Sequence, residues 1–217
     1  MISATAAAQD GVEIRLAGGK AAVSDWVVEQ TLDLAAAARL MGDTAPVESA
    51  RVCVIEVGAG GAAISVVPCQ VDPAESADPH VITWQAPGQT RPGQTRRFLI
   101  TLDGRDGALQ HAAPLVTTAD EHHVRLVNGP IALEHARDAG GMIHHVTVDG
   151  APGDLSWQDY LNMISPDRPH HSYPHAAEQL RVVASGSLRA VVEARTELLE
   201  NGKSHPSGPR VTYRFTT

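Results

Sequence analysis

The most regular feature of this 217-residue chain is the alternation of apolar and polar positions. In "VEIRL" (12–16) every second residue is apolar, and the same period recurs in "FLITL" (98–102) and "RVTYRF" (210–215). A period of two is typical of β-strands that bury one face. Apolar runs predict further strands at 27–32, 51–57, 63–67, 123–127, 131–136, 142–148, 180–185 and 188–195.

Glycine-rich turns separate several of these strands. "GAGG" (58–61), "NGP" (128–130), "DAGG" (138–141) and "NGK" (201–203) carry residues that adopt the backbone angles of tight turns. We therefore expect a hairpin at each of these four positions.

One segment lacks the strand pattern and predicts a helix. "DLAAAARLMG" (33–42) is rich in alanine, with Asp33 placed to cap its start and Gly42 placed to end it. A helix of about two turns is unstable alone, so we expect it to pack against a sheet.

Together the elements predict an all-β chain of two modules. Residues 1–107 are expected to form a small β barrel or sandwich that carries the helix. Residues 108–217 are expected to form part of a larger antiparallel β-sandwich. The boundary falls in "GRDGALQHAAPLVTTAD" (104–120), which is typical of a connection with one short strand.

The final strand has no turn after it, and an uncovered strand edge promotes aggregation. We therefore expect a covalent continuation into a C-terminal domain.

Charge and composition remove several classes of function. The formal net charge is −8 and there is no basic run, which argues against nucleic acid or an anionic membrane as a partner. No run of eighteen apolar residues is present to span a bilayer. The N-terminus lacks the basic and apolar regions of a complete signal peptide, which favours a cytoplasmic location and leaves export open. Motifs for serine hydrolysis and nucleotide binding are absent from the sequence.

The densest candidate chemistry is "SPDRPHHSYPH" (165–175). Metal binding needs ligands that converge from regular elements, whereas Pro169 and Pro174 flank the histidines and prevent a helix from presenting them on one face. The sequence therefore predicts no metal and no cofactor. An ordinary surface loop and a loop that faces a ligand both remain open.

The surrounding segment 154–175 has little strand pattern and is expected to be a long loop between two strands. Its aromatic residues either pin the loop to the sandwich or stack on a sugar ring. Its polar residues suit hydrogen bonds to hydroxyls or to a uronate carboxylate. The candidate substrate-binding residues are Trp157, Asp159, Tyr160, Asn162, Arg168, His171 and Tyr173. For a lyase reaction, His171 or Tyr173 is a candidate base and Arg168 a candidate neutraliser of the carboxylate, but no catalytic residue is assigned.

A histidine pair lies inside a predicted strand. Neighbouring residues on a strand point to opposite faces, so His144 and His145 are not expected to bind one ion. His144 shares its predicted face with Met142 and Val146. We therefore expect it to be a buried histidine with its hydrogen bonds satisfied.

Several stretches resemble known carbohydrate-active proteins. "VVPCQVDP" (66–73) followed by "VITWQAPGQTRPGQTRRFLI" (81–100) resembles the N-terminal module of exo-rhamnogalacturonan lyase-like (YetA-like) proteins. "HHVRLVNGPIALEHARDAGGMIHHVTVDG" (122–150) and "VVASGSLRAVVEARTEL" (182–198) resemble strands of the β-sandwich found in many carbohydrate-active enzymes. In the stretch 182–198, Ser187 stands where the pattern usually has proline.

This resemblance implies a second module of the mutarotase-like supersandwich type. It further implies that the chain is the N-terminal, substrate-shaping β region of a polysaccharide lyase-like protein. The partner would be a uronate-containing oligo- or polysaccharide, and the catalytic residues would lie mostly in a later, largely helical domain outside this chain.

Two alternatives stay open. One is a freestanding carbohydrate-binding or structural β-sandwich module without catalysis. The other is a member of the methane-oxygenase-like (PmoA-like) group, which shares the N-terminal module. Its Asp-His-Pro-His-His signature is only loosely similar to "DRPHHSYPH".

Overall fold

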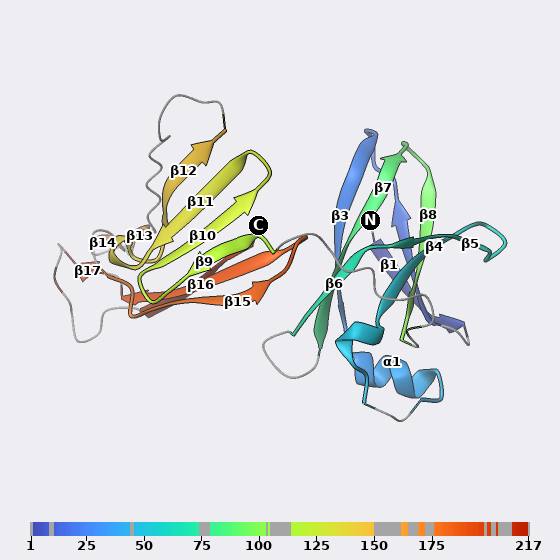
Figure 1. The fold of residues 1–217 in the computed structure, drawn as a ribbon. Helices are drawn as coiled ribbons and strands as arrows, with labels where there is room; N and C mark the ends of the chain where they lie inside the picture. Colours follow the sequence, from blue (N-terminus) through green and yellow to red (C-terminus); the bar gives the residue numbers. More distant parts are fainter. Residues whose placement is uncertain are drawn as a thin grey trace. The chain divides into compact units, whose positions relative to one another are not determined.

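The computed structural model of the chain forms two compact units, residues 1–112 and 113–217 (Figure 1). The predicted module boundary at 107/108 lies outside the described residues. Among the described residues, no helix is long and apolar enough to cross a membrane. The structure describes residues 2–8, 11–43, 46–73, 79–102, 104, 114–149, 162–164, 169–171, 176–197, 199–200, 203 and 210–216.

Unit 1 (residues 1–112) is a sandwich of two antiparallel sheets. The larger sheet has the strand order β1-β2-β8-β4-β5 and the smaller one β3-β7-β6. Within the described residues both sheets are open rather than closed into a barrel, so the sandwich form of the prediction holds. The elements are β1 (Ile2–Ala8), β2 (Gly11–Ala17), β3 (Val23–Leu32), α1 (Leu34–Leu40), η1 (Ser49–Arg51), β4 (Cys53–Val57), β5 (Ala63–Val67), β6 (Cys69–Pro73), β7 (His80–Thr90) and β8 (Thr95–Thr101).

The core of unit 1 follows the alternation of its strands. Ile14 and Leu16 of β2 are fully buried, and so are Phe98 and Ile100 of β8. The smaller sheet contributes Trp84, whose ring centroid lies 5.8 Å from that of Phe98. The apolar faces of both sheets therefore meet in one core.

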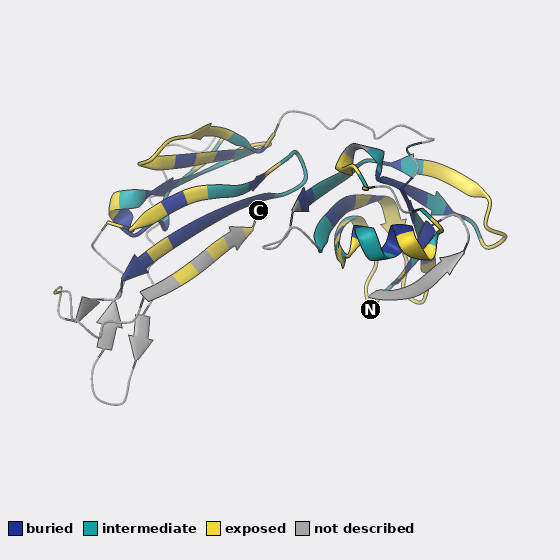
Figure 2. Cartoon of the chain, turned by 90° about the horizontal axis from the view of Figure 1, so that it is seen from below, coloured by how far each residue is buried: buried dark blue, intermediate teal, exposed yellow. Residues whose placement is uncertain are grey.

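The predicted helix is confirmed, together with both of its caps. The Asp33 side chain accepts a hydrogen bond of 2.7 Å from the Ala36 N–H. At the other end Gly42 has a φ of 82°, and the Asp43 N–H donates to the Ala38 carbonyl at 2.9 Å. This bond and the positive φ are those of a glycine-terminated helix end. The helix buries one face and exposes the other (Figure 2).

Unit 2 (residues 113–217) also contains packed antiparallel sheets. A four-stranded sheet with the order β12-β11-β10-β9 shares a core with the sheet β15-β16-β18, and a small sheet has the order β13-β14-β17. The elements are β9 (Val116–Ala119), β10 (His123–Asn128), β11 (Ile131–Ala136), η2 (Arg137–Ala139), β12 (Ile143–Val148), β13 (Asn162–Ile164), β14 (Pro169–His171), β15 (Gln179–Ser185), β16 (Ala190–Glu197), β17 (Leu199–Glu200) and β18 (Arg210–Thr216).

The all-β class and most of the predicted strands are confirmed. "GAGG" joins β4 to β5, "NGP" joins β10 to β11, and "DAGG" lies between β11 and β12. Asn201 and Gly202 of the fourth predicted turn lie outside the described residues. The expected long loop at 154–175 needs correction, because it contains the short strands β13 and β14.

Candidate functional site

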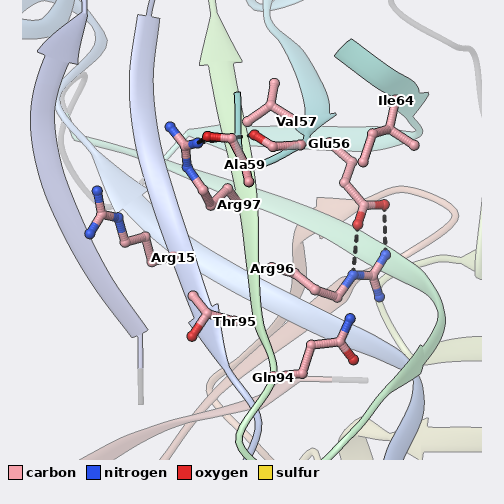
Figure 3. Close-up of a pocket in the computed structure, with 10 residues that line it drawn as sticks. Arg15, Glu56, Val57, Ala59, Ile64, Gln94, Thr95, Arg96 and Arg97 are labelled. Atoms are coloured by element: carbon pink, nitrogen blue, oxygen red, sulfur yellow. Dashed lines mark hydrogen bonds and ion pairs between the residues drawn. The ribbon is translucent and has the colours of Figure 1, made fainter. Parts of the chain in front are cut away.

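A surface pocket of about 500 Å³ lies at one end of the larger sheet of unit 1 (Figure 3). It forms because β8 is longer than β4: the pairing of these strands stops at Val57 and Arg97, whereas β8 begins at Thr95, which pairs with Ala17 of β2. The turn of the β4–β5 hairpin supplies a second wall. The residues that line the pocket are Arg15, Glu56, Val57, Gly58, Ala59, Ile64, Gln94, Thr95, Arg96 and Arg97.

A nearly buried ion pair forms one side of this pocket. Arg96 shares the core-facing side of β8 with Phe98, and its side chain is only 7% exposed. The Arg96 Nε and Nη2 atoms donate to the two carboxylate oxygens of Glu56 at 2.8 and 2.7 Å. The guanidinium also lies 5.4 Å from the centroid of the Phe98 ring. A buried charge requires such pairing, so we expect this side of the pocket to be rigid.

Arg97 points to the opposite face of β8 and connects three parts of the sheet. Its Nε and Nη2 donate to Glu13 of β2 at 3.1 and 2.6 Å. Its Nη1 donates to the carbonyls of Gly58 and Ala59 at 3.0 Å each. Arg97 therefore holds the hairpin wall in place relative to β2.

Glu13 is bound by two arginines. In addition to Arg97, the Arg15 Nε donates to the Glu13 carboxylate at 2.6 Å. The hydrogen bond from Arg97, followed by the one from Arg15, lowers the pKa of Glu13 to about 2. Glu13 is therefore a poor base near neutral pH, and the cluster of two arginines and one glutamate carries a net positive charge.

Arg15 is the most accessible cation of the pocket. Its side chain is 51% exposed, and no partner for its two terminal nitrogens is found among the described residues. Three arginines and one glutamate line the pocket, so its lining is positive although the chain carries −8. Beside these charges, Ile64 exposes an apolar side chain. The arrangement can bind an anionic group on a ligand that also has an apolar surface.

Two of the seven residues predicted from the sequence as a binding site are among the described residues, Asn162 and His171. Trp157, Asp159, Tyr160, Arg168 and Tyr173 lie outside the described residues. Asn162 lies on β13 and His171 on β14, where the two are direct register partners.

His170 and His171 lie on the short strand β14 rather than in the predicted loop, and no helix presents them. Pro169 is the first residue of β14, a position where a strand tolerates a residue without an N–H. His170 pairs with Met163 of β13 and with Glu200 of β17. Within the described parts of the chain, no group of three or more potential metal ligands is found.

The burial and hydrogen bonding of His144 differ from the prediction. The register between β11 and β12 shifts between Glu134 and His135, which leaves His144 without a direct partner. The shift interrupts the alternation on which the prediction relied. His144 is consequently half-buried, and its buried Nδ1 has no hydrogen-bond partner among the described residues. The fully buried histidine is instead His135, whose Nδ1 lies 3.1 Å from the Gly141 carbonyl oxygen.

No family model matches the chain, and no curated protein matches it. A solved structure of a protein in the glycosyl hydrolase family 38 from Enterococcus faecalis is similar over 87% of this chain, with 11% identity and a TM-score of 0.46. The chain spans 24% of the length of that protein.

Proposed function

We propose that the chain is the non-catalytic, substrate-shaping β region of a carbohydrate-active protein that binds uronate-containing glycans. The observation that carries this proposal is the positive pocket of unit 1 with its accessible Arg15. The resemblance to exo-rhamnogalacturonan lyase-like proteins supports the same class of ligand.

The chemistry of the pocket suits an acidic sugar. A guanidinium recognises a carboxylate through charge-assisted hydrogen bonds, which are roughly twice as strong as neutral ones. The side chains of Gln94 and Thr95 are exposed in the same pocket and carry groups that hydrogen-bond hydroxyls. Ile64, 65% exposed, offers an apolar surface to the C–H face of a sugar ring.

The same contacts argue for binding rather than catalysis. A lyase needs a base that is active near neutral pH, but Glu13 is held ionised with a pKa of about 2. Glu56 is engaged in two hydrogen bonds with Arg96. Catalytic residues in a following domain, as the resemblance implies, agree with this arrangement. A freestanding binding module is the second candidate, because the same pocket would serve it without a following domain.

Calorimetric titration of the chain with oligogalacturonides and with neutral oligosaccharides of equal length tests the proposal. We expect the acidic ligands to bind more tightly and Arg15→Gln to weaken them by about tenfold or more, since a hydrogen bond between charged groups contributes about 1.5–3 kcal/mol. The matched control is Arg39→Gln on the exposed side of α1, which should leave affinity unchanged. Equal binding of neutral and acidic ligands, or no effect of Arg15→Gln, would contradict the proposal.

Trp157 and Tyr160 stay predicted contacts from the sequence. If Trp157 stacks on a sugar, Trp157→Ala lowers glycan affinity without changing the midpoint of thermal unfolding. If it only pins a loop, the variant changes stability alone.

A further inference from the structure

A second pocket, of about 490 Å³, lies at the turn between β7 and β8. Gln94 lines both this pocket and the one described above, where its side chain lies beside Thr95 (Figure 3). The two pockets are therefore neighbours on unit 1. The residues that line the second pocket are Gln89, Arg91, Pro92, Gly93 and Gln94.

The turn is built from a short sequence duplication, because "PGQTRPGQTR" (87–96) contains the same five residues twice. The glycines of the two copies, Gly88 and Gly93, have the same φ of 72°. Their arginines differ in environment. Arg96 is nearly buried in its ion pair, whereas Arg91 is exposed and no partner for its guanidinium is found among the described residues. The duplication thus supplies one arginine to the fold and leaves the other available to a ligand.

Hydrogen bonds hold the turn in a defined position. The Gly18 N–H at the end of β2 donates to the Gln94 carbonyl at 2.8 Å. Within the turn, the Arg91 N–H donates to the side-chain Oε1 of Gln94 at 2.9 Å, and the Gln94 N–H donates to the Arg91 carbonyl at 3.1 Å. A turn that is already ordered loses less conformational entropy when a ligand binds.

The second pocket has a positive lining, since Arg91 is the one charged residue among those that line it. Asp25 of β3 accepts a hydrogen bond of 2.8 Å from the nearby Gly88 N–H but does not line the pocket. A Cβ at Gly18 would collide with the Arg91 carbonyl oxygen, so this strand end and the turn are in close contact. Gly18 follows Arg15 by three residues, about 10 Å of extended chain. The backbones of Arg15 and Arg91 are therefore separated by a span that suits two successive sugars.

We infer that the β7–β8 turn forms a second sugar subsite, in which Arg91 binds the carboxylate of the uronate next to the one held by Arg15. Gln94 lies between the two arginines, and its amide can hydrogen-bond to hydroxyls of either sugar. The ligand class rests on the proposed function; the new element is the recognition of two consecutive acidic sugars. The first contact raises the effective concentration of the second carboxylate at Arg91, so the second carboxylate should increase affinity.

The test compares digalacturonate with an aldobiouronic acid, a disaccharide of equal length that has a single carboxylate. Both are titrated into the full chain, and binding is followed by NMR shifts of the backbone amides. We expect digalacturonate to bind about tenfold more tightly, because it adds a hydrogen bond between charged groups, and to shift the Gly93 and Gln94 amides. Arg91→Gln should remove this difference and leave the affinity for the aldobiouronic acid nearly unchanged. The matched control Arg39→Gln, on the exposed side of α1, should preserve the difference.

The outcomes separate this inference from the proposed function. If Arg15→Gln weakens both ligands but Arg91→Gln weakens neither, the second subsite is overturned and the proposed function stands. An equal loss of affinity for both ligands in Arg91→Gln also overturns the subsite, because Arg91 would then not recognise the second carboxylate. If Arg15→Gln affects neither ligand, the proposed function fails, and the second subsite fails with it because the two share one ligand.

Discussion

Gly141 offers the sharpest test of how unit 2 is packed. It has a φ of 78°, and a Cβ built on it would lie 2.4 Å from the Cβ of Ala194. That methyl group would also contact Ala177 and Leu180 at 3.5 Å. Ala194 is fully buried on β16, which is the central strand of its sheet. Neither the turn nor β16 can therefore move away without disturbing other contacts.

The expected cost of Gly141→Ala has two parts. A left-handed conformation costs a residue with a Cβ about 1–2 kcal/mol. Overpacking of a filled core adds about 1–3 kcal/mol, because carbon atoms prefer separations of about 3.5–4.0 Å. We therefore expect a loss of about 2–5 kcal/mol in the free energy of unfolding, a large share of the 5–15 kcal/mol that is typical of a folded protein.

Gly129→Ala is the matched control for this prediction. Gly129 has a φ of 56°, but a Cβ there would meet no atom within 4 Å. Gly129→Ala should therefore lower the free energy of unfolding only by the cost of the left-handed conformation, without the additional loss from overpacking.

Urea unfolding should be measured together with hydrogen exchange, because two units need not unfold in one transition. For Gly141→Ala we expect the β11 and β16 amides to lose protection while the β2 and β8 amides keep theirs. If Gly141→Ala lowers the free energy of unfolding no more than Gly129→Ala does, the close approach of Gly141 to Ala194 of β16 is refuted.

Three further predictions concern charged groups. Arg96→Met should cost about 3 kcal/mol because it leaves the Glu56 carboxylate without its partner, and adding Glu56→Leu should restore most of the loss in urea unfolding. The lowered pKa of Glu13 contributes stability that is present above pH 4.5 and is lost as the pH falls toward 2; Glu13→Gln should flatten a plot of unfolding free energy against pH in that window. Burial lowers the pKa of His135 below 6.5. The buried neutral imidazole therefore leaves the folded state fully stable above that pH, and stability is lost on acidification as the unfolded chain binds the proton more readily. His135→Asn, which cannot take up a proton, should reduce this loss in unfolding measurements between pH 7 and 5.

Local patterns predicted most of the strands and the helix. The alternation in "VEIRL" placed Ile14 and Leu16 in the core, and Asp33 with Gly42 marked both ends of α1. In contrast, β1 consists of small residues with little alternation and was not predicted. The strands β13 and β14 were missed because three-residue strands are too short to show a period.

The pocket of unit 1 was not predicted, although part of its signal was visible. Two consecutive arginines on a strand must point to opposite faces, so Arg96 and Arg97 need different partners. Those partners are Glu56, 40 residues away, and Glu13, 84 residues away. No local pattern pairs them, because the pairing depends on which strands become neighbours.

The sequence by itself determined which residues face the core in the regularly alternating strands such as β2 and β8, where the helix begins and ends, and where most turns fall, because these depend on near neighbours along the chain. Only the tertiary structure decided the strand order, the difference in length between β4 and β8 that opens the pocket, and the shift that displaces His144 from its predicted face. It also decided that two arginines would share Glu13. The physical reason is that these features depend on the register between strands far apart in the chain, and alternation within one strand does not encode that register.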